Sequence, residues 1–393
     1  MSYGRDTVYL DHAATTPVDP AVVQAMLPYF SSDFGNPSSI YQSGQHGHAG
    51  LDRARSQVAG VLGCRTSEVI FTSGATESIG LALRGVAWAA KLRNPDSTPH
   101  IVSTAVEHHA VLHTLDALER QGFRVTLVGC NATGMIRPED VFAAIEPDTC
   151  LVSVMLANNE VGTIQPVAEI GAEVRARGIV MHTDAVQAAG SLPLDVSGLH
   201  VDLLSLSAHK FYGPKGVGVL YARKGVQLEW TQEGGGQESG RRGGTENVPL
   251  IVGMGEAIVR AEQSREQYIA FATELRDELF RAILERVDGV SLNGPEFGPD
   301  RLPNNLNITI NGVQGETVLL SLDIMGVEAS AGSACTTGNA EPSHVLLAMG
   351  LDEEAARASL RLSVGRGNSI EEMYQAADAL AEVVGRIRTL AGL

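Results

Sequence analysis

Cysteine is scarce in this chain of 393 residues. The cysteines stand far apart and form no C-x-x-C pair; they are Cys64, Cys130, Cys150 and Cys335. This spacing is not typical of a disulfide framework, so we expect neither disulfides nor a metal site. A reducing cytoplasm suits such isolated thiols best.

Positive charge is also in short supply. The 29 Lys and Arg residues are outnumbered by 46 Asp and Glu residues, and the net charge is −17 at pH 7. So acidic a surface repels phosphate groups, which argues against nucleic acid and against an anionic membrane as partners. No apolar run approaches the roughly 18 residues that cross a bilayer, and residues 1–10 do not resemble a signal peptide. We therefore expect a soluble, globular, cytoplasmic protein.

Short apolar runs recur through the first two thirds of the chain. They lie at residues 69–71, 101–102, 125–128, 151–156, 179–181, 203–206 and 217–221. Runs that are apolar on both faces are typical of a sheet buried on both sides. Helix-like stretches, such as 78–90 and 111–120, separate most of them, which predicts a mainly parallel sheet with helices on both faces. Ligands of such sheets bind beyond the carboxyl ends of the strands.

The last third of the chain has a different pattern. Residues 234–247 are rich in glycine and polar residues and are predicted to form a loop. Residues 251–283 are predicted to form one long helix. Weaker strands are predicted at 305–310 and 360–363, and an amphipathic helix with one apolar face from Ile370 to Ile387 follows. We expect a second, smaller α/β domain from about residue 260.

Lysine is rare, and Lys210 is the most distinctive of the four in the chain. It follows the apolar run at 203–206, so it stands at a predicted strand end. An amine held there could bind an aldehyde cofactor covalently. Ser207 and His209 could then donate to a phosphate group of that cofactor. The alternative is a solvated surface lysine.

A carboxylate follows the preceding apolar run, at Asp184. Buried there, it could keep a pyridinium nitrogen protonated and so maintain the ring as an electron sink. The alternative is a helix cap. Gln187, about one helical turn later, could donate to the phenolic oxygen of the same ring.

Residues 71–78, Phe-Thr-Ser-Gly-Ala-Thr-Glu-Ser, are predicted to form a strand end, a glycine turn and a helix start. The free amides of a helix N-terminus, here including Ala75 and Thr76, make an anion site that suits a phosphate. The alternative is an ordinary helix cap. Thr245, in the predicted glycine-rich loop, is another candidate phosphate contact.

Two further side chains follow predicted strands. His108 could stack on a cofactor ring and move protons, because the pKa of histidine lies near neutrality; the alternative is an ordinary core or surface histidine. Asn158 also stands just past a predicted strand, where ligands of such a sheet bind, and the alternative is a turn asparagine.

Together these segments resemble the cysteine desulfurase family, within the class V aminotransferase-like, fold-type I pyridoxal-phosphate enzymes. The matching segments cover nearly the whole chain and are residues 9–17, 34–39, 72–78, 107–111, 157–162, 182–187, 205–218, 241–247, 332–336 and 360–366. The Ser-x-Cys-Thr setting of Cys335 is similar to the first group of the family, the iron–sulfur and nitrogen-fixation type. The Arg-x-Gly-His-His-Cys pattern of the second group is absent from the sequence.

The resemblance implies an α/β fold with a large cofactor-binding domain at residues 15–259, built on a mainly parallel seven-stranded sheet. It implies a smaller domain formed by residues 1–14 and 260–393. That domain carries the loop of Cys335, about residues 329–340. The Gly, Ser, Ala and Thr residues of this loop favour mobility, whereas the alternative for a lone cysteine is a small buried hydrophobe.

The resemblance also assigns roles to the candidate residues. Lys210, His108 and Cys335 are implied as catalytic. The implied contacts of the cofactor, pyridoxal 5′-phosphate, are Lys210, Ala75, Thr76, His108, Asn158, Asp184, Gln187, Ser207, His209 and Thr245. The implied substrate contacts are Arg361, Asn158 and Asn36, with the Arg361 guanidinium clamping the carboxylate. Thr245 is implied to reach the phosphate of the neighbouring subunit in a homodimer.

The implied reaction removes sulfur from L-cysteine, leaves L-alanine and produces a persulfide on Cys335. The persulfide would pass to an acceptor or scaffold protein, with iron–sulfur cluster assembly as the expected use. A selenocysteine lyase or another class V enzyme is the alternative among enzymes. A catalytically inactive sulfur carrier is the alternative outside them.

Overall fold

The computed structural model describes residues 7–331 and 341–392 of the chain. Seven strands form one sheet in the order β2-β8-β7-β6-β5-β3-β4. Their bounds are β2 (Val69–Thr72), β3 (His100–Thr104), β4 (Arg124–Val128), β5 (Thr149–Ser153), β6 (Val180–Asp184), β7 (Leu203–Ser207) and β8 (Gly218–Ala222). Strand β8 runs antiparallel to both of its neighbours, and the other pairs are parallel. The seven predicted apolar runs supply these strands, so the predicted mainly parallel sheet is confirmed.

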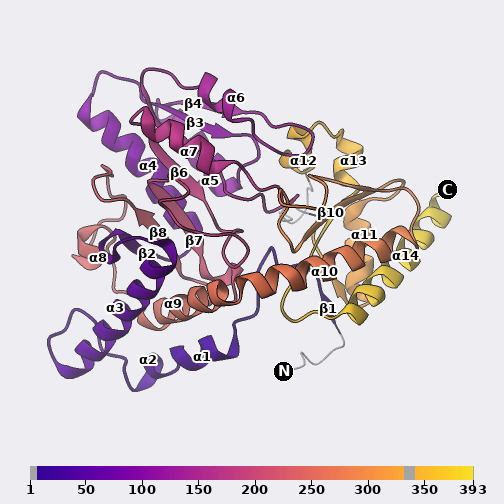
Figure 1. Cartoon of the computed structure of the whole chain (residues 1–393), viewed down its shortest axis with the longest axis horizontal. Helices are drawn as coiled ribbons and strands as arrows, with labels where there is room; N and C mark the ends of the chain where they lie inside the picture. Colours follow the sequence, from indigo (N-terminus) through magenta and orange to yellow (C-terminus); the bar gives the residue numbers. More distant parts are fainter. Residues whose placement is uncertain (1–6, 332–340, 393) are drawn as a thin grey trace.

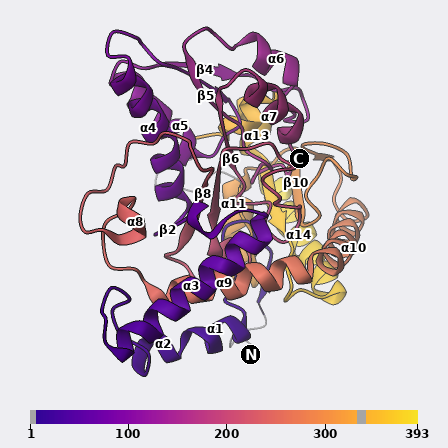
Figure 2. The same ribbon diagram turned by 60° about the vertical axis from the view of Figure 1, so that its left-hand side comes forward.

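Both faces of this sheet are largely buried, as the sequence predicted, except at the edge strand β4, where Leu127 is 47% exposed. Successive residues of one strand face opposite sides. In β2, Ile70 packs in the cluster that holds α4 (Ala75–Arg93) and α5 (His109–Arg120), whereas Val69 and Phe71 pack in the cluster on the other face. That other cluster includes residues of α3 (Gln42–Leu62), α6 (Pro138–Ala143), α7 (Val167–Ala176) and α9 (Val248–Gln263). We call this part of the molecule the large lobe (Figures 1 and 2).

A small lobe is built on a three-stranded antiparallel sheet in the order β12-β10-β9. These strands are β9 (Val290–Leu292), β10 (Asn305–Ile310) and β12 (Ser359–Ser363). Near the chain start, β1 (Val8–Tyr9) pairs in parallel with β11 (Val327–Glu328), so the first strand belongs to this lobe. The remaining helices are α1 (Pro20–Met26), α2 (Pro28–Ser31), α8 (Gln237–Gly240), α10 (Arg265–Leu284), α11 (Gly315–Ile324), α12 (His344–Ala348), α13 (Glu353–Arg357) and α14 (Ile370–Ala391).

The predicted helix at 251–283 is wrong as a single element. The chain forms α9 and α10 instead, separated at Ser264, where the backbone leaves the helical region with φ −100° and ψ 6°. The Ser264 hydroxyl donates to the Arg260 carbonyl at 2.8 Å and accepts from Arg366 at 2.9 Å, which stabilises the break. In Figure 1 the two helices follow one another from the large lobe into the small lobe. The break therefore directs one apolar face into each core.

The large lobe and the small lobe have separate apolar cores, which supports a division of the chain into two domains. The small-lobe core combines Val8 and Leu10 with residues from 272 to 384, including the predicted apolar face of α14. Val345, Leu346 and Met349 are exceptions, because they pack into the large-lobe core although they come late in the chain. The boundaries 15–259 and 260–393 stay a prediction that this packing supports.

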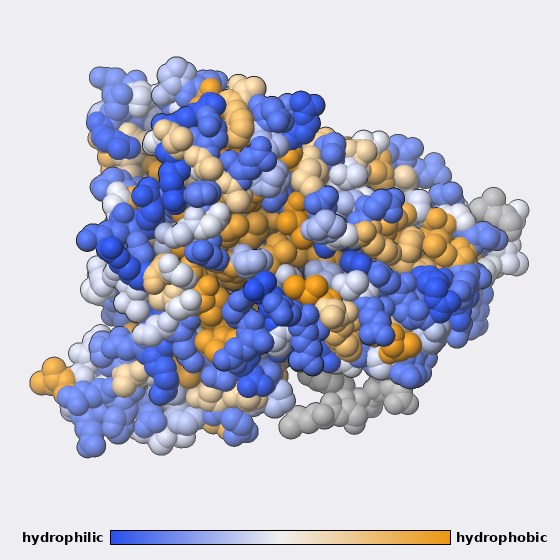
Figure 3. Space-filling model, viewed as in Figure 1, coloured by the Kyte–Doolittle hydropathy of each residue, from blue (hydrophilic) through white to orange (hydrophobic). Residues whose placement is uncertain are grey.

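The surface is mainly hydrophilic on the face shown in Figure 3, and apolar surface gathers near its middle, between the two lobes. Among the described residues, no helix is long and apolar enough to cross a membrane.

Candidate active site

Lys210 lies at the end of the short 3₁₀ helix Ala208–Lys210, which follows β7 directly. Its Nζ donates to the carbonyl oxygens of Ala13 and Ala14, both at 2.7 Å. Burial, followed by the nearby Arg361 cation, lowers the pKa of Lys210 to about 8. The alternative of a solvated surface lysine is therefore wrong.

Asp184 ends β6, the neighbour of β7, and is 5% exposed. Its Oδ1 accepts from Val186 N at 3.0 Å. Burial raises the pKa of Asp184 to about 6, and the Val186 amide and the Lys210 cation oppose that rise. Asp184 is thus mainly a carboxylate at pH 7, close to a lysine that carries the opposite charge.

His108 is the N-cap residue of α5, where its Nδ1 accepts from Ala110 N at 3.0 Å. Because Nδ1 accepts, the proton of the neutral ring lies on Nε2. Surrounding protein atoms and the Lys210 cation lower the pKa of His108 to about 4, although part of the residue remains open to solvent. The ring is therefore neutral at pH 7.

The start of α4 lies against the ends of β7 and β8. A Cβ at Gly218 would come within 2.5 Å of the Gly74 backbone, so only glycine allows this close approach. Ser207 Oγ is 4.0 Å from the point that a Cβ on Gly74 would occupy. Ala75 and Thr76 open α4, before the first amide that bonds within the helix, Ser78 N to Gly74 O. Free amides and a hydroxyl thus gather in one place.

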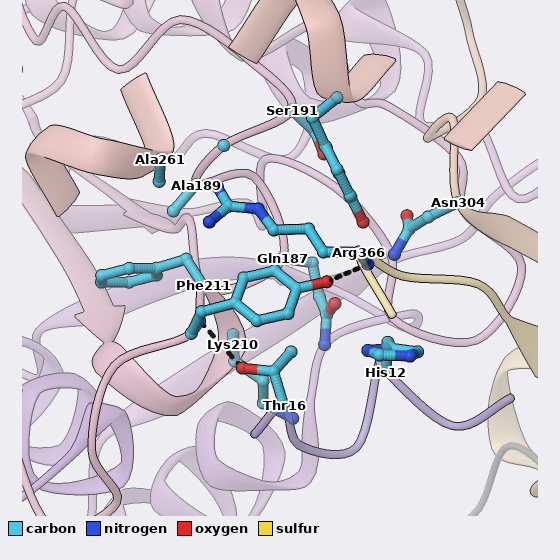
Figure 4. A pocket seen from close by; sticks show the side chains of 13 residues that line it. His12, Thr16, Gln187, Ala189, Ser191, Lys210, Phe211, Ala261, Asn304 and Arg366 are labelled. Atoms are coloured by element: carbon cyan, nitrogen blue, oxygen red, sulfur yellow. Dashed lines mark hydrogen bonds between the residues drawn. The ribbon is translucent and has the colours of Figure 1, made fainter. Parts of the chain in front are cut away.

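A cavity lies beside Lys210 at the boundary between the lobes (Figure 4). Gln187 lines it and donates from Nε2 to Ala13 O at 3.0 Å, the same carbonyl that Lys210 contacts. His12 and Arg366 also line it, and both are visible in Figure 4. The cavity is therefore lined by Lys210 and Gln187 of the large lobe together with His12 and Arg366.

Comparisons with known proteins agree on one family. The family model for class-V aminotransferases matches residues 8–375. "Cysteine desulfurase IscS" of Methanosarcina thermophila is 47% identical over 393 residues, covering 100% of this chain and 96% of the relative. A solved "NifS-like protein" has a TM-score of 0.90 at 37% identity, covering 97% of this chain and 100% of its own. The structure "SspA in complex with cysteine" has a TM-score of 0.79 at 37% identity and covers 91% of this chain and 99% of its own.

The chain belongs to the cysteine desulfurase family of class-V aminotransferases. This family depends on pyridoxal 5′-phosphate, and the residues present fit that cofactor. Lys210 offers a buried amine with a lowered pKa, and Asp184 offers a buried carboxylate for a ring nitrogen. The α4 start, with Ser207 beside it, offers donors for a phosphate.

Arg361, the substrate clamp implied by the family, lies on β12 and is 4% exposed. Its Nη2 donates to Asp11 Oδ1 at 2.8 Å and its Nη1 to Asn159 O at 3.1 Å. Its Nε is buried and has no hydrogen-bond partner among the described residues. The guanidinium thus retains a donor, which suits a planar carboxylate ligand.

Asn158 follows β5 and is fully buried. Its Oδ1 accepts from Glu160 N at 2.8 Å and from Val161 N at 2.9 Å, and its Nδ2 donates to Val106 O at 2.9 Å. These contacts are those of a turn asparagine. A cofactor or substrate contact of Asn158 stays a prediction.

The other candidates are less closely grouped. His209 Nδ1 is 3.2 Å from Thr15 Oγ1. Asn36 is exposed in the loop between α2 and α3, where its Oδ1 accepts from Ser38 N at 2.9 Å. Thr245 is exposed and lines a second cavity with Thr72 and Ser73, which are separated from α4 by Gly74 alone. Cys335 lies outside the described residues.

Sequence reasoning missed several neighbours of the site. Asp11 pairs with Arg361, and the carbonyls of Ala13 and Ala14 hold Lys210. Glu107, beside His108, is completely buried. All of them fall in the segments that match the family, so membership in those segments was the available signal. No group of three or more metal-binding side chains is arranged to hold an ion in the part of the chain that the structure describes.

Proposed function

We propose that this protein is a cysteine desulfurase that moves the sulfur of L-cysteine onto Cys335 and leaves L-alanine. The observation that carries this proposal is the Lys210 amine, buried beside ionised Asp184 at the strand ends. Similarity over the full chain to a relative named for this activity supports it. The persulfide then passes to an acceptor protein, with iron–sulfur cluster assembly as its use.

When bound, pyridoxal phosphate supplies an electron sink for negative charge at the substrate α-carbon. The Asp184 carboxylate would hold the ring nitrogen of the bound cofactor in its protonated form. Lys210 has a substantial neutral fraction just above pH 7, because its pKa is about 8, and so it can accept the α-proton and return it. Neutral His108 can donate a hydrogen bond from Nε2 and stack on a ring, while the Ala110 amide occupies its Nδ1.

Arg361 binds the substrate carboxylate through its planar guanidinium. Asp11 keeps that guanidinium oriented while the substrate is absent, through the 2.8 Å contact to Nη2. Asn36 and Asn158 are proposed to assist in substrate binding, as the family resemblance implies.

The Cys335 sulfur then forms a bond to the substrate sulfur while the carbon–sulfur bond of the substrate breaks. The thiol proton and the electron pair of the broken bond stay with the three-carbon product, so cysteine plus a thiol gives alanine plus a persulfide. A thiolate is the reactive form, and the substrate amine is a better acceptor for the thiol proton than His108, whose pKa of about 4 makes it a weak base.

We propose a homodimer in which Thr245 reaches the phosphate of the neighbouring subunit. The exposure of Thr245 and Asn36 in a single chain supports this assembly. We also place the protein in the cytoplasm, where a reducing environment preserves the described free thiols Cys64, Cys130 and Cys150.

Replacing Cys335 by alanine tests the sulfur transfer directly. The Cys335→Ala protein should bind the cofactor and L-cysteine as before, yet produce neither alanine nor sulfide. Cys130→Ala is the matched control, because Cys130 is a half-buried thiol whose pKa is raised by burial, and it should react like the natural protein. Unimpaired alanine production by Cys335→Ala would remove this cysteine from the mechanism. Faster release of selenide from selenocysteine than of sulfide from cysteine would instead favour a selenocysteine lyase.

A further inference from the structure

Glu107 is a buried carboxyl group that the proposed mechanism does not use. It lies three residues after β3 and is 0% exposed. Its Oε1 accepts from Thr104 Oγ1 at 2.9 Å and from Met155 N at 2.8 Å. Its own carbonyl contacts His344 Nε2 at 2.9 Å, so side chain and backbone are both held in place.

The second carboxyl oxygen of Glu107, Oε2, is buried and has no partner among the described residues. A carboxylate with one oxygen unsatisfied in the interior carries a large desolvation cost, whereas the protonated acid avoids burying a charge. The two donors on Oε1 fit either form, because a carbonyl oxygen also accepts hydrogen bonds. Burial and hydrogen bonding therefore favour a protonated Glu107.

Glu107 and Asp184 flank the same short segment after β5. Met155 N donates to Glu107 Oε1 at 2.8 Å, and the next amide, Leu156 N, donates to Asp184 O at 2.8 Å. The two acidic residues thus lie on either side of residues 155–156, which follow β5. His108 is next to Glu107 along the chain. Burial raises the pKa of Asp184, and the Lys210 cation opposes part of that rise.

The order of ionisation follows from these surroundings. Asp184 ionises first, with a pKa of about 6, because a backbone amide and the Lys210 cation favour its charge. Glu107 ionises later, with a pKa of about 8, because burial and then the negative charge of Asp184 oppose it, while Met155 N and Thr104 only partly compensate. Two coupled carboxyl groups in one buried region behave in this way.

We infer that Glu107 is a positioning residue that stays protonated beside Asp184 and so confines the negative charge of this buried pair to the carboxylate that serves the cofactor ring. The inference rests on the proposed function for the part played by Asp184. The described hydrogen bonds of Glu107 are with Thr104, Met155 and His344, and none is with Lys210 or the Asp184 carboxylate. Glu107 acts through Asp184, and through residues 155–156, whose amides donate to Glu107 and Asp184.

Infrared spectroscopy of the full-length protein tests the protonation state, with and without pyridoxal phosphate. At pH 7 the natural protein should show the C=O stretching band of a buried carboxylic acid, and the band should disappear with a midpoint near pH 8. Glu107→Gln should lack the band.

Glu160→Gln is the matched control, because Glu160 is also buried, at 3% exposure, and accepts from Ser343; this variant should keep the band. Absence of the band from the natural protein at pH 7, or its persistence in Glu107→Gln, would overturn the inference.

Chemical unfolding of the same proteins gives a second readout. The folded pKa of Glu107 lies above its ordinary value of 4.5, so the folded state binds more protons between pH 4.5 and about 8. The stability of the natural protein relative to Glu107→Gln should therefore fall as the pH rises through this range. A stability difference that is constant with pH would contradict a protonated Glu107.

The loaded enzyme separates a positioning role from a purely structural one. The Gln side chain keeps the acceptor for Met155 N, so Glu107→Gln should retain kcat within about threefold at pH 7. Above pH 7 its spectral and kinetic pH profile should change, because only the transition of Lys210, whose pKa is also about 8, remains. Glu107→Leu removes the acceptor and should lower kcat by about tenfold. If the pH profiles of kcat and of the spectrum are unchanged in Glu107→Gln, Glu107 has only a structural role. Failure of the natural protein to take up pyridoxal phosphate would instead refute the proposed function, while the infrared result would still decide the state of Glu107.

Discussion

Two regions of the candidate site differ in how firmly a single chain holds their residues. One region is the carboxyl ends of the central strands, and the other is the exposed segments around Asn36 and Thr245. At the strand ends, Lys210 and Asp184 are held by hydrogen bonds, and burial moves both pKa values towards neutrality. Asn36 and Thr245 lie on the surface, and Asn36 contacts only its own loop in the described hydrogen bonds.

This difference separates two kinds of functional residue. Lys210 and Asp184, which we propose for the chemistry at the cofactor, lie in a largely buried setting at the strand ends within one subunit. The residues assigned to outer contacts remain available to a second copy of the chain. Changes at the strand ends should therefore alter chemistry, and changes at the exposed segments should alter cofactor retention and assembly.

The largest effect is expected from Asp184→Asn. The amide cannot supply the negative charge that keeps a ring nitrogen protonated, so kcat should fall by roughly 10²–10³-fold, as for loss of one preorganised electrostatic contact. Steady-state alanine production measures it. Asp202→Asn is the matched control, because Asp202 is 1% exposed and pairs with Arg175 and Arg223; it should lose stability and keep kcat. Equal losses of kcat in both variants would show that Asp184 is only structural.

Lys210 should make the stability of the cofactor-free protein depend on pH. Its folded pKa of about 8 lies below the ordinary 10.5, so the unfolded chain binds more protons between these values and stability rises with pH there. The total gain is at most about 3 kcal/mol. Denaturant unfolding at pH 7.5 to about 10.5 measures it. The gain should be absent from Lys210→Met, and an equal pH dependence in both proteins would show that Lys210 is not the group responsible.

A smaller effect is expected at the exposed segment, from Thr245→Ala. Loss of one hydrogen bond to a charged phosphate should weaken cofactor binding by roughly 10- to 150-fold, because such a bond contributes about 1.5–3 kcal/mol. Equilibrium dialysis of pyridoxal phosphate at several protein concentrations measures it, and dilution should weaken binding further once dimers separate. Thr317→Ala, on the exposed face of α11, is the control. A cofactor affinity unaffected by both dilution and Thr245→Ala would end the proposed contribution of a second subunit.

Much of the fold could be predicted because each strand of the large sheet is a short run that is apolar on both faces. The helix break at Ser264 could not, since apolar periodicity continues across it and the residue that stabilises it, Arg366, is distant in sequence. The packing of Val345 and Leu346 in the large-lobe core is similarly a long-range effect. The local sequence pattern predicts which face of a helix or strand is apolar. It does not predict which of the two apolar cores that face packs against.

The site divides in the same way. Lys210, Asp184 and His108 could be found because each follows a predicted strand and carries a distinctive functional group. Glu107 was overlooked because its role depends on burial and on the neighbouring charge of Asp184, which only the assembled strands bring about. The hydrogen bonds of Asn158 were also invisible in sequence, because they involve the backbone of its own turn.

The most direct test of the account is to find which amine holds the cofactor. The protein is loaded with pyridoxal phosphate, reduced with borohydride and digested, and the labelled peptide is sequenced. The account predicts visible absorbance that L-cysteine bleaches, and a label on Lys210 that is absent from Lys210→Ala and present in Lys215→Ala, whose altered lysine is exposed. A label on another of the four lysines, or a loaded protein that stays colourless, would contradict it.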